Sequence, residues 1–206
     1  LLSLVQQYTP GGTLPALPDN FIGAMRQALA AKGTDSSIVA NTLTLPDAET
    51  LSTQVDVIDP DAIDAAIKHT KKALAMALKA ELLATYDALA SSGAYEFSAA
   101  EVGRRRLRNT CLAYLSAADS TEDVAARAMV QFKAANCMSD KLAALSALTD
   151  LPVDTPEREK ALSIFFDDAQ GDALVVNKWF TIQASAGVDG VLAEVQKLRA
   201  HPEFTM

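Results

Sequence analysis

The side chains that could do chemistry are few and widely spaced along the 206 residues. A zinc peptidase of the HExxH type needs two histidines four positions apart on one helix face, with a glutamate between them to activate the water. The only histidines here are His69 and His201. Lysines surround His69, which predicts a surface residue, and His201 ends the last helical segment, where an imidazole suits the helix dipole. We therefore predict that no residue of this chain binds a metal.

The two cysteines, Cys111 and Cys137, form no CxxC motif, and they match neither a disulfide framework nor a zinc knuckle. A cysteine and histidine pair stays open as an alternative, because the fold and not the spacing sets such contacts. Both cysteines lie outside any nucleophile motif, so we expect reduced thiols in the core. The sequence also has no G-x-S-x-G, no G-x-G-x-x-G and no P-loop. We predict no catalytic and no cofactor-binding residue.

The charge of the chain also excludes classes of partner. Acidic residues outnumber basic ones by 26 to 18, and the net charge of −8 repels a phosphate backbone. One basic cluster could bind phosphate; it consists of Arg104, Arg105, Arg106 and Arg108. Because it lies beside Glu101 in a helical segment, we expect a solvated helix face. No apolar run approaches the roughly 18 residues that span a bilayer, so a membrane is not expected as partner. Because of the net charge, nucleic acid is not expected either.

The elements that must position these residues are helices. Apolar residues, half of the chain, recur at helical spacing, whereas glycine and proline collect between the periodic segments. The predicted class is therefore all-α. We expect helices at 1–8, 21–33, after 35, after 47, 59–93, 97–118, 120–136, 138–150, 155–170, 172–185 and 187–204.

Several helix starts carry a side chain that can cap free backbone N–H groups. The candidates are Asp19 or Asn20 for the second helix, Thr34 or Asp35 for the third, and Asp47 for the fourth. The strongest signal is segment 59–93, where Asp59 can cap, Pro60 suits the first helical position, and apolar residues recur from Ile63 to Tyr86. This segment predicts one long amphipathic helix.

Turns of a few residues make neighbouring helices antiparallel, so each helix pair has to bury its apolar stripe against the next. We predict an irregular superhelix of antiparallel helix pairs, an armadillo-like α-solenoid, with a closed bundle as the alternative. Residues 1–57 are expected to form a loop-rich helical lead-in of the same domain, and residues 58–206 the stacked α-helical repeats.

The string VVNKWFTIQA, residues 175–184, contains the only tryptophan and is a candidate binding site. A helix would place Val175, Trp179 and Ile182 on one apolar stripe. We therefore expect Trp179 to anchor neighbouring helices, with one partner for its indole N–H, rather than to stack on a ligand.

Several strings resemble the C-terminal domain of the bacterial-type aminopeptidase N family, which are zinc-dependent gluzincin aminopeptidases. They are LTLPDAETL (43–51), IDPDAI (58–63), RRLRNTCLAYL (105–115), QFKAANCMSDKLAALSAL (131–148), NKWFTIQA (177–184) and HPEFTM (201–206). The strings stand in the order that the family has, and the resemblance covers the chain from near residue 43 to its end.

The resemblance implies that the chain is a fragment of a peptidase that removes N-terminal amino acids from peptides. Zinc and the Gly-Ala-Met-Glu-Asn segment would belong to a preceding catalytic domain, the partner of this segment, and would act there on peptide substrates. This segment would be structural, capping the active-site chamber and limiting access to it, and Asn136 is a candidate for facing that chamber. The expected location is the cytoplasm, or an organelle if a transit peptide was removed. The alternative is a free-standing helical-repeat module that binds a protein or peptide.

Overall fold

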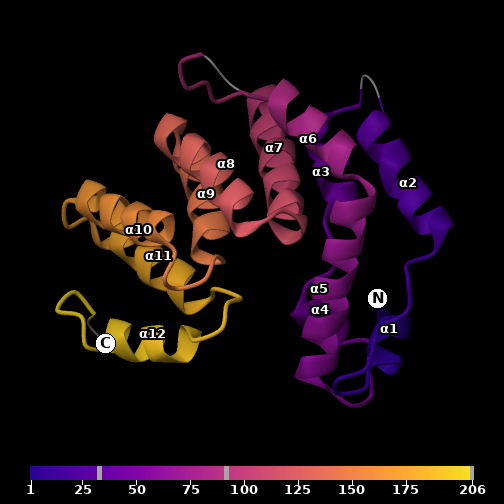
Figure 1. The fold of residues 1–206 in the computed structure, drawn as a ribbon. Coiled ribbons are helices and arrows are strands. Elements are labelled where there is room, and N and C mark those ends of the chain that lie inside the picture. Colours follow the sequence, from indigo (N-terminus) through magenta and orange to yellow (C-terminus); the bar gives the residue numbers. More distant parts are fainter. Residues whose placement is uncertain (32–33, 91–92, 205–206) are drawn as a thin grey trace. The chain divides into compact units, whose positions relative to one another are not determined.

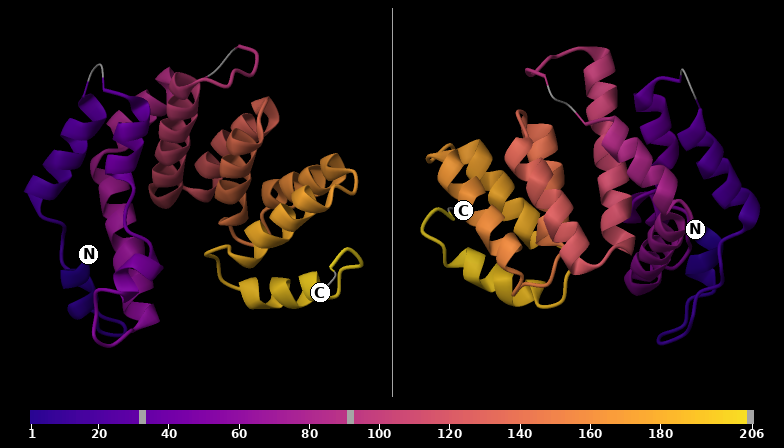
Figure 2. Two further views of the ribbon diagram at one scale, coloured as in Figure 1. Left: turned by 180° about the vertical axis from the view of Figure 1, so that it is seen from behind. Right: turned by 45° about the horizontal axis from the view of Figure 1, so that its top comes forward.

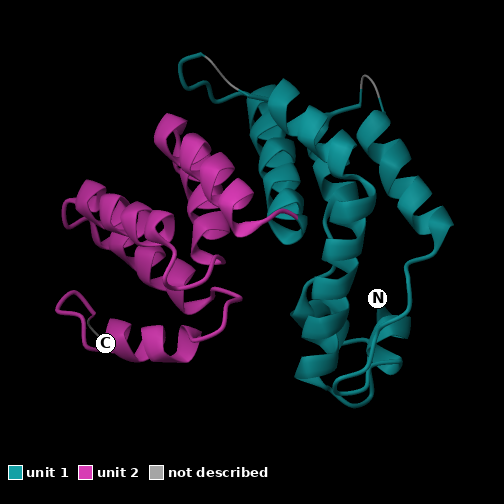
Figure 3. Cartoon of the chain, in the orientation of Figure 1, with its two compact units in different colours: residues 1–118 teal, residues 119–206 magenta. Residues whose placement is uncertain are grey.

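The computed structural model describes residues 1–31, 34–90 and 93–204, and these ranges contain twelve α-helices and no strand (Figure 1). The predicted all-α class is confirmed. Gly33, the predicted end of the second helix, lies outside the described residues. The chain divides into two compact units, residues 1–118 and residues 119–206 (Figure 3). The boundary between these units differs from residue 57, where the sequence analysis ended the loop-rich lead-in. That residues 1–57 form a lead-in of the same domain stays a prediction.

Unit 1 is built around its last helix, α7, which packs against α3, α5 and α6. Its helices are α1 (Leu2–Gln6), α2 (Asp19–Ala30), α3 (Ser36–Leu43), α4 (Ala48–Ser52), α5 (Pro60–Ala77), α6 (Lys79–Ala88) and α7 (Ala99–Ala118). The apolar side of α7 carries Leu107, Cys111 and Leu115, which are all buried. These residues recur at four-residue spacing, so one stripe of α7 supplies much of the core of the unit.

The helix starts in unit 1 follow the predicted caps in three cases. The carboxylates of Asp35, Asp47 and Asp59 accept hydrogen bonds from the N–H groups of Ser37, Thr50 and Ala62 at 2.6, 2.8 and 3.0 Å. The prediction of a cap at Asp19 or Asn20 is wrong. Pro18 is the N-cap of α2, and Asp19 lies inside the first turn, where its charge still suits the helix dipole.

The predicted single helix over 59–93 is also wrong, because it breaks at Leu78 into α5 and α6. Leu78 has φ −116° and ψ 14°, outside the helical range, and its side chain is buried. An unbroken helix would pair the carbonyl of Ala77 with the N–H of Glu81. Here Arg26 of α2 donates to that carbonyl at 3.0 Å and to the Glu81 carboxylate at 2.8 Å. A side chain from another helix therefore occupies the gap in the ladder, a recognised cause of kinks.

Unit 2 is a stack of short helices that pack on their neighbours along the chain. They are α8 (Thr121–Ala134), α9 (Met138–Thr149), α10 (Pro156–Ala169), α11 (Ala173–Ala184) and α12 (Val191–Arg199). Both views of Figure 2 show α10 and α11 side by side. Phe132, Leu145, Leu148 and Phe165 are fully buried and fill the space between α8, α9 and α10. The short connections and pairwise packing are those of stacked helix pairs.

Candidate functional site

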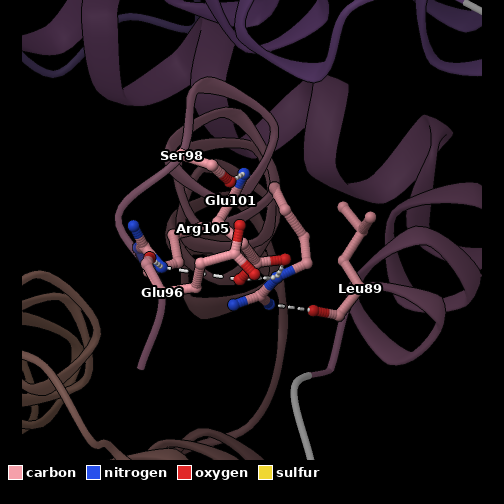
Figure 4. A network of polar contacts seen from close by, with 6 residues as sticks. Leu89, Glu96, Ser98, Glu101 and Arg105 are labelled. Carbon is pink, nitrogen blue, oxygen red and sulfur yellow. Dashed lines mark hydrogen bonds and ion pairs between the residues drawn. The ribbon is translucent and has the colours of Figure 1, made fainter. Parts of the chain in front are cut away.

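The basic cluster of the sequence lies in a polar network at the start of α7 (Figure 4). The Arg104 Nε atom donates to both carboxylate oxygens of Glu101 at 3.0 and 2.9 Å, and its guanidinium also donates to the carbonyl of Leu89. The Arg105 Nη1 atom donates to the carbonyl of Glu96 at 3.1 Å and lies 3.5 Å from the Glu101 carboxylate. One glutamate thus holds two arginines, and each arginine binds a main-chain carbonyl.

The expected solvated face is therefore wrong for most of this cluster. Arg105 is only 6% exposed, Arg104 and Arg108 are half-buried, and Arg106 alone is exposed. The Arg108 guanidinium lies 4.4 Å from the centre of the Tyr86 ring, and its Nε donates to the Tyr86 carbonyl at 3.4 Å. These arginines bind carbonyls at the C-terminal end of α6 and in the following segment, where helical carbonyls lack partners. The arrangement does not present a group of free cations to a phosphate.

An arginine also binds a helix end in unit 2. Arg158 is 3% exposed, and its Nε donates to the carbonyl of Thr149, the last residue of α9, at 3.2 Å. Its Nη2 atom is buried and has no hydrogen-bond partner among the described residues. Arg158 therefore connects the first turn of α10 to the end of α9.

The cysteines differ from each other. Cys111 is fully buried, and burial raises the pKa of its thiol to about 12, so it is not a thiolate at neutral pH. Its predicted place in the core is confirmed. Cys137 is half-buried and occupies the N-cap of α9, so the prediction of a core residue is wrong there. The cause is that α9 begins only at Met138, which leaves Cys137 in the turn.

The two histidines belong to different units and both have structural contacts. His69 donates from Nε2 to the carbonyl of Pro15 at 2.9 Å, which ties the loop before α2 to α5. It is half-buried, so the expected surface position holds only in part. The Nδ1 atom of His201 accepts a hydrogen bond from the N–H of Glu203 at 3.2 Å, one turn beyond the end of α12.

The string around Trp179, which was predicted to anchor neighbouring helices, lies in an aromatic cluster of unit 2. The ring centres of Phe166, His201 and Phe180 lie 4.9, 5.3 and 5.1 Å from that of Trp179. Phe180 in turn lies 5.5 Å from Phe204. Tilted and edge-on rings at these distances attract one another beyond their burial alone.

Trp179 has the partner that the sequence required. Its indole N–H donates to the carbonyl of Leu162 in α10 at 3.0 Å, and the ring is half-buried. The predicted stripe of Val175, Trp179 and Ile182 is only half-buried. The buried residues of α11 are Val176 and Gln183, and Leu174 is 72% exposed. Trp179 and Phe180 of the string NKWFTIQA thus meet His201 and Phe204, which lie more than twenty residues later in the sequence, in one packed cluster.

One hollow of unit 1 has about 330 Å³, and its polar groups are already engaged. It lies between the end of α3, the start of α4, α5 and α7. The hydroxyl of Tyr114 donates to the carbonyl of Leu43 at 2.6 Å, and burial raises the pKa of Tyr114 to about 12. Hydrogen bonds from Thr50 hold the pKa of the Asp47 carboxyl below its usual value. Neither group suits proton transfer at neutral pH, which needs a pKa near 7.

A second hollow, of about 700 Å³, lies in unit 2 between α8 and the start of α10. The residues that line it include Ala125, Met129, Glu122, Lys133 and Glu157. The volume lies within the range of small-molecule sites.

In the ranges that the structure describes, no group of three or more histidine, cysteine or acidic side chains could hold a metal ion. Nor is any described helix long and apolar enough to cross a membrane.

These features define a domain of paired α-helices, in which the conspicuous side chains support the packing. The whole chain, residues 1–206, matches the family described as "Domain of unknown function (DUF3458_C) ARM repeats", and it belongs to that family. ARM repeats are stacked helices, so the predicted α-solenoid fold is confirmed.

The relatives of the chain are aminopeptidases. It is 35% identical over 191 residues to aminopeptidase N of Escherichia coli (strain K12), which is 93% of this chain and 22% of that protein. Aminopeptidase N of Haemophilus influenzae is 30% identical over 200 residues, again with 22% of its length covered. The crystal structure of Legionella pneumophila aminopeptidase A in complex with aspartic acid matches 99% of the chain and 24% of that protein, with a TM-score of 0.82 and 26% identity. The chain thus spans about a fifth of the length of the curated relatives it matches.

Proposed function

We propose that this chain is the C-terminal helical domain of a zinc-dependent peptidase of the aminopeptidase N type, which removes N-terminal amino acids from peptides. The observation that carries the proposal is the similarity of nearly the whole chain to aminopeptidases from several bacteria, over only 22% of their length. The remaining length of such an enzyme has ample room for the zinc site and for the recognition of the free amine.

In this proposal the 206 residues contribute shape rather than catalysis, by capping the active-site chamber and limiting access to it. The state of the reactive groups supports this role. The thiol of Cys111 is buried and protonated, and the hydroxyl of Tyr114 is bound to a carbonyl. Arg104 and Arg105 are engaged with Glu101 and with the main chain. None of these groups is poised to react with a peptide bond.

The partner of the domain is then the catalytic domain of the same polypeptide, and the substrates of the full enzyme are peptides. Zinc would be held by that catalytic domain and would supply the activated water there. We place the enzyme in the cytoplasm, with no nucleic acid or membrane as partner. The excess of acidic over basic residues disfavours a nucleic-acid partner, because it repels a phosphate backbone.

The test compares the full-length gene product with the isolated 206-residue chain on alanyl and leucyl chromogenic substrates. We expect chelator-sensitive hydrolysis and bound zinc for the full-length protein, and neither for the isolated chain. Circular dichroism of the isolated chain must show helical structure, so that the absence of activity is not due to unfolding. A full-length protein without peptidase activity overturns the proposal, and chelator-sensitive hydrolysis by the isolated chain overturns its structural role.

A further inference from the structure

The segment directly before α7 exposes aromatic rings to solvent. We call residues 93–98 the aromatic loop. Tyr95 is 53% exposed and Phe97 is 81% exposed, and Val102 in the first turns of α7 is 41% exposed. Exposed apolar residues are common one at a time, but two aromatic rings and a valine close together in one segment are not explained by the packing of unit 1.

The aromatic loop is held in place by a buried arginine. The Arg105 guanidinium lies 5.2 Å from the centre of the Tyr95 ring, and its Nη1 donates to the Glu96 carbonyl at 3.1 Å. The side chain of Arg105 is only 7% exposed, and Glu101 contacts it from the same helix (Figure 4). Arg105 of α7 therefore holds Tyr95 and Glu96, the two residues that precede Phe97.

A fixed loop with exposed rings has the properties of a binding anchor. Aromatic residues are enriched at the centres of protein interfaces, where they carry much of the binding energy. Ordering a flexible loop on binding costs free energy, and a loop that is already held by Arg105 avoids much of that cost.

We propose that the aromatic loop docks onto the part of the parent aminopeptidase chain that lies outside these 206 residues. The inference rests on the proposed function, in which about four fifths of the enzyme lie outside this segment, since the chain spans 22% of its relatives. Tyr95 and Phe97 enter an apolar recess of that partner surface. The carboxylate of Glu96, which is exposed between the two rings, faces a basic side chain at the edge of the recess.

The test uses the full-length protein with Cys137→Ser, because Cys137 is half-buried whereas Cys111 is fully buried. A reporter thiol is placed by Ala94→Cys, since Ala94 is exposed and adjoins Tyr95, and its labelling is followed at that residue by peptide mass mapping. Its rate of reaction with a thiol reagent is compared with that of a short peptide of the same local sequence. Docking predicts a rate at least about tenfold below that of the peptide, because the partner surface blocks the reagent.

Two further variants make the result specific. Adding Phe97→Ala to the reporter protein removes the more exposed ring and should return the rate to within about threefold of the peptide. The control Asp154→Cys, in an exposed segment of unit 2, should react within about twofold of its own peptide. The reaction rates of Ala94→Cys and of the control Asp154→Cys are measured at several protein concentrations. Protection that disappears on dilution assigns the loop to a second copy of the chain and overturns the proposal.

The two proposals fail in different ways. If Ala94→Cys reacts at the rate of its peptide in a protein that hydrolyses alanyl substrates, docking is overturned and the proposed function stands. If Ala94→Cys is protected in a full-length protein without peptidase activity, the loop docks as inferred, but the identity of the parent enzyme is overturned.

Discussion

The start of α7 in unit 1 and the aromatic cluster of unit 2 hold helix ends together by different means. In unit 1, Arg104 and Arg108 donate to carbonyls in and after the last turn of α6, and Glu101 neutralises part of their charge. In unit 2, Trp179 and His201 join α10, α11 and the segment after α12 through ring contacts and a single indole hydrogen bond. The first solution depends on charge and direction, and the second mainly on shape.

The comparison teaches that a conspicuous string of residues need not be a binding site. The four arginines at 104–108 were a candidate phosphate site, expected instead to form a solvated face, and the string around Trp179 was a candidate binding site, expected instead to anchor helices. Each set of side chains is instead engaged with the rest of its own unit. Charged groups are costly to bury without partners, so we expect the arginine network to be the more sensitive of the two.

The largest effect should follow from Arg105→Ala. It removes a buried cation from the Glu96 carbonyl and from Glu101, leaving both without that partner. We expect the free energy of unfolding to fall by about 3 kcal/mol, the scale for breaking a buried pair. Denaturant unfolding followed by circular dichroism measures it. Arg106→Ala, at the neighbouring exposed arginine, should cost less than about 0.5 kcal/mol, and equal effects of the two variants would contradict the distinction.

The next effect should follow from Trp179→Ala. The ring is half-buried, so we expect a loss of about 2 kcal/mol, below the range for fully buried aromatic residues. Trp179→Phe keeps most ring contacts but loses the hydrogen bond to Leu162, and it should cost about 1 kcal/mol. Urea unfolding of both variants separates the two contributions. If Trp179→Phe is as damaging as Trp179→Ala, the hydrogen bond and not the ring contacts dominates this cluster.

A smaller, pH-dependent effect should come from the buried thiol of Cys111. Burial raises the pKa of Cys111 from 9.0 to about 12, so its contribution to stability is complete below pH 9 and is lost as the pH rises toward 12. Between pH 9 and pH 10 the loss should be about 1 kcal/mol. Tyr114, whose pKa is raised from 10.0, adds a loss of the same sign at higher pH. Cys111→Ala should flatten the slope of unfolding free energy against pH between pH 9 and pH 10, measured by urea unfolding at each pH, and an unchanged slope would contradict the assignment to Cys111.

The smallest effect concerns the break between α5 and α6. The hydrogen bond from Arg26 lowers the pKa of Glu81, so this contribution is present above pH 4.5 and is lost as the pH falls through the folded value. The side chains of Arg26 and Glu81 are 47% and 38% exposed, and solvent screening limits the pair to about 0.5 kcal/mol. The difference in stability between the wild type and Arg26→Met should therefore shrink from pH 7 to pH 3. A difference that stays constant would assign the effect of Arg26 to the Ala77 carbonyl alone.

Much of the fold could be predicted from local signals. Asp35, Asp47 and Asp59 were recognisable caps because an aspartate before a periodic segment offers an acceptor to free N–H groups. The break at Leu78 had no such signal, since leucine and its neighbours favour helix. It becomes intelligible only when Arg26, more than fifty positions earlier in the chain, is seen to bind the Ala77 carbonyl.

The candidate site was predicted less completely. The need of Trp179 for an N–H partner follows from the chemistry of indole, but its acceptor on Leu162 does not. The aromatic loop was not predicted, because the helix was expected to begin at Phe97, whereas α7 begins at Ala99 and leaves Phe97 in the preceding segment. A solvent-exposed charged helix face and a buried arginine network can have the same residues in the same order. The position of Glu101 in the sequence therefore did not show that Arg105 is buried.

The sequence by itself determined the all-α class, most helix starts and the resemblance to aminopeptidases. The class follows from the periodicity of apolar residues, the helix starts from neighbouring residues, and the resemblance from several strings that occur in the same order as in the family. Only the tertiary structure decided which charges are buried, where the long helix breaks and which rings stay exposed. Those outcomes depend on partners that are distant in the sequence, such as Arg26 for Ala77 and His201 for Trp179. Burial and hydrogen bonding are properties of the packed chain, and no local pattern contains them.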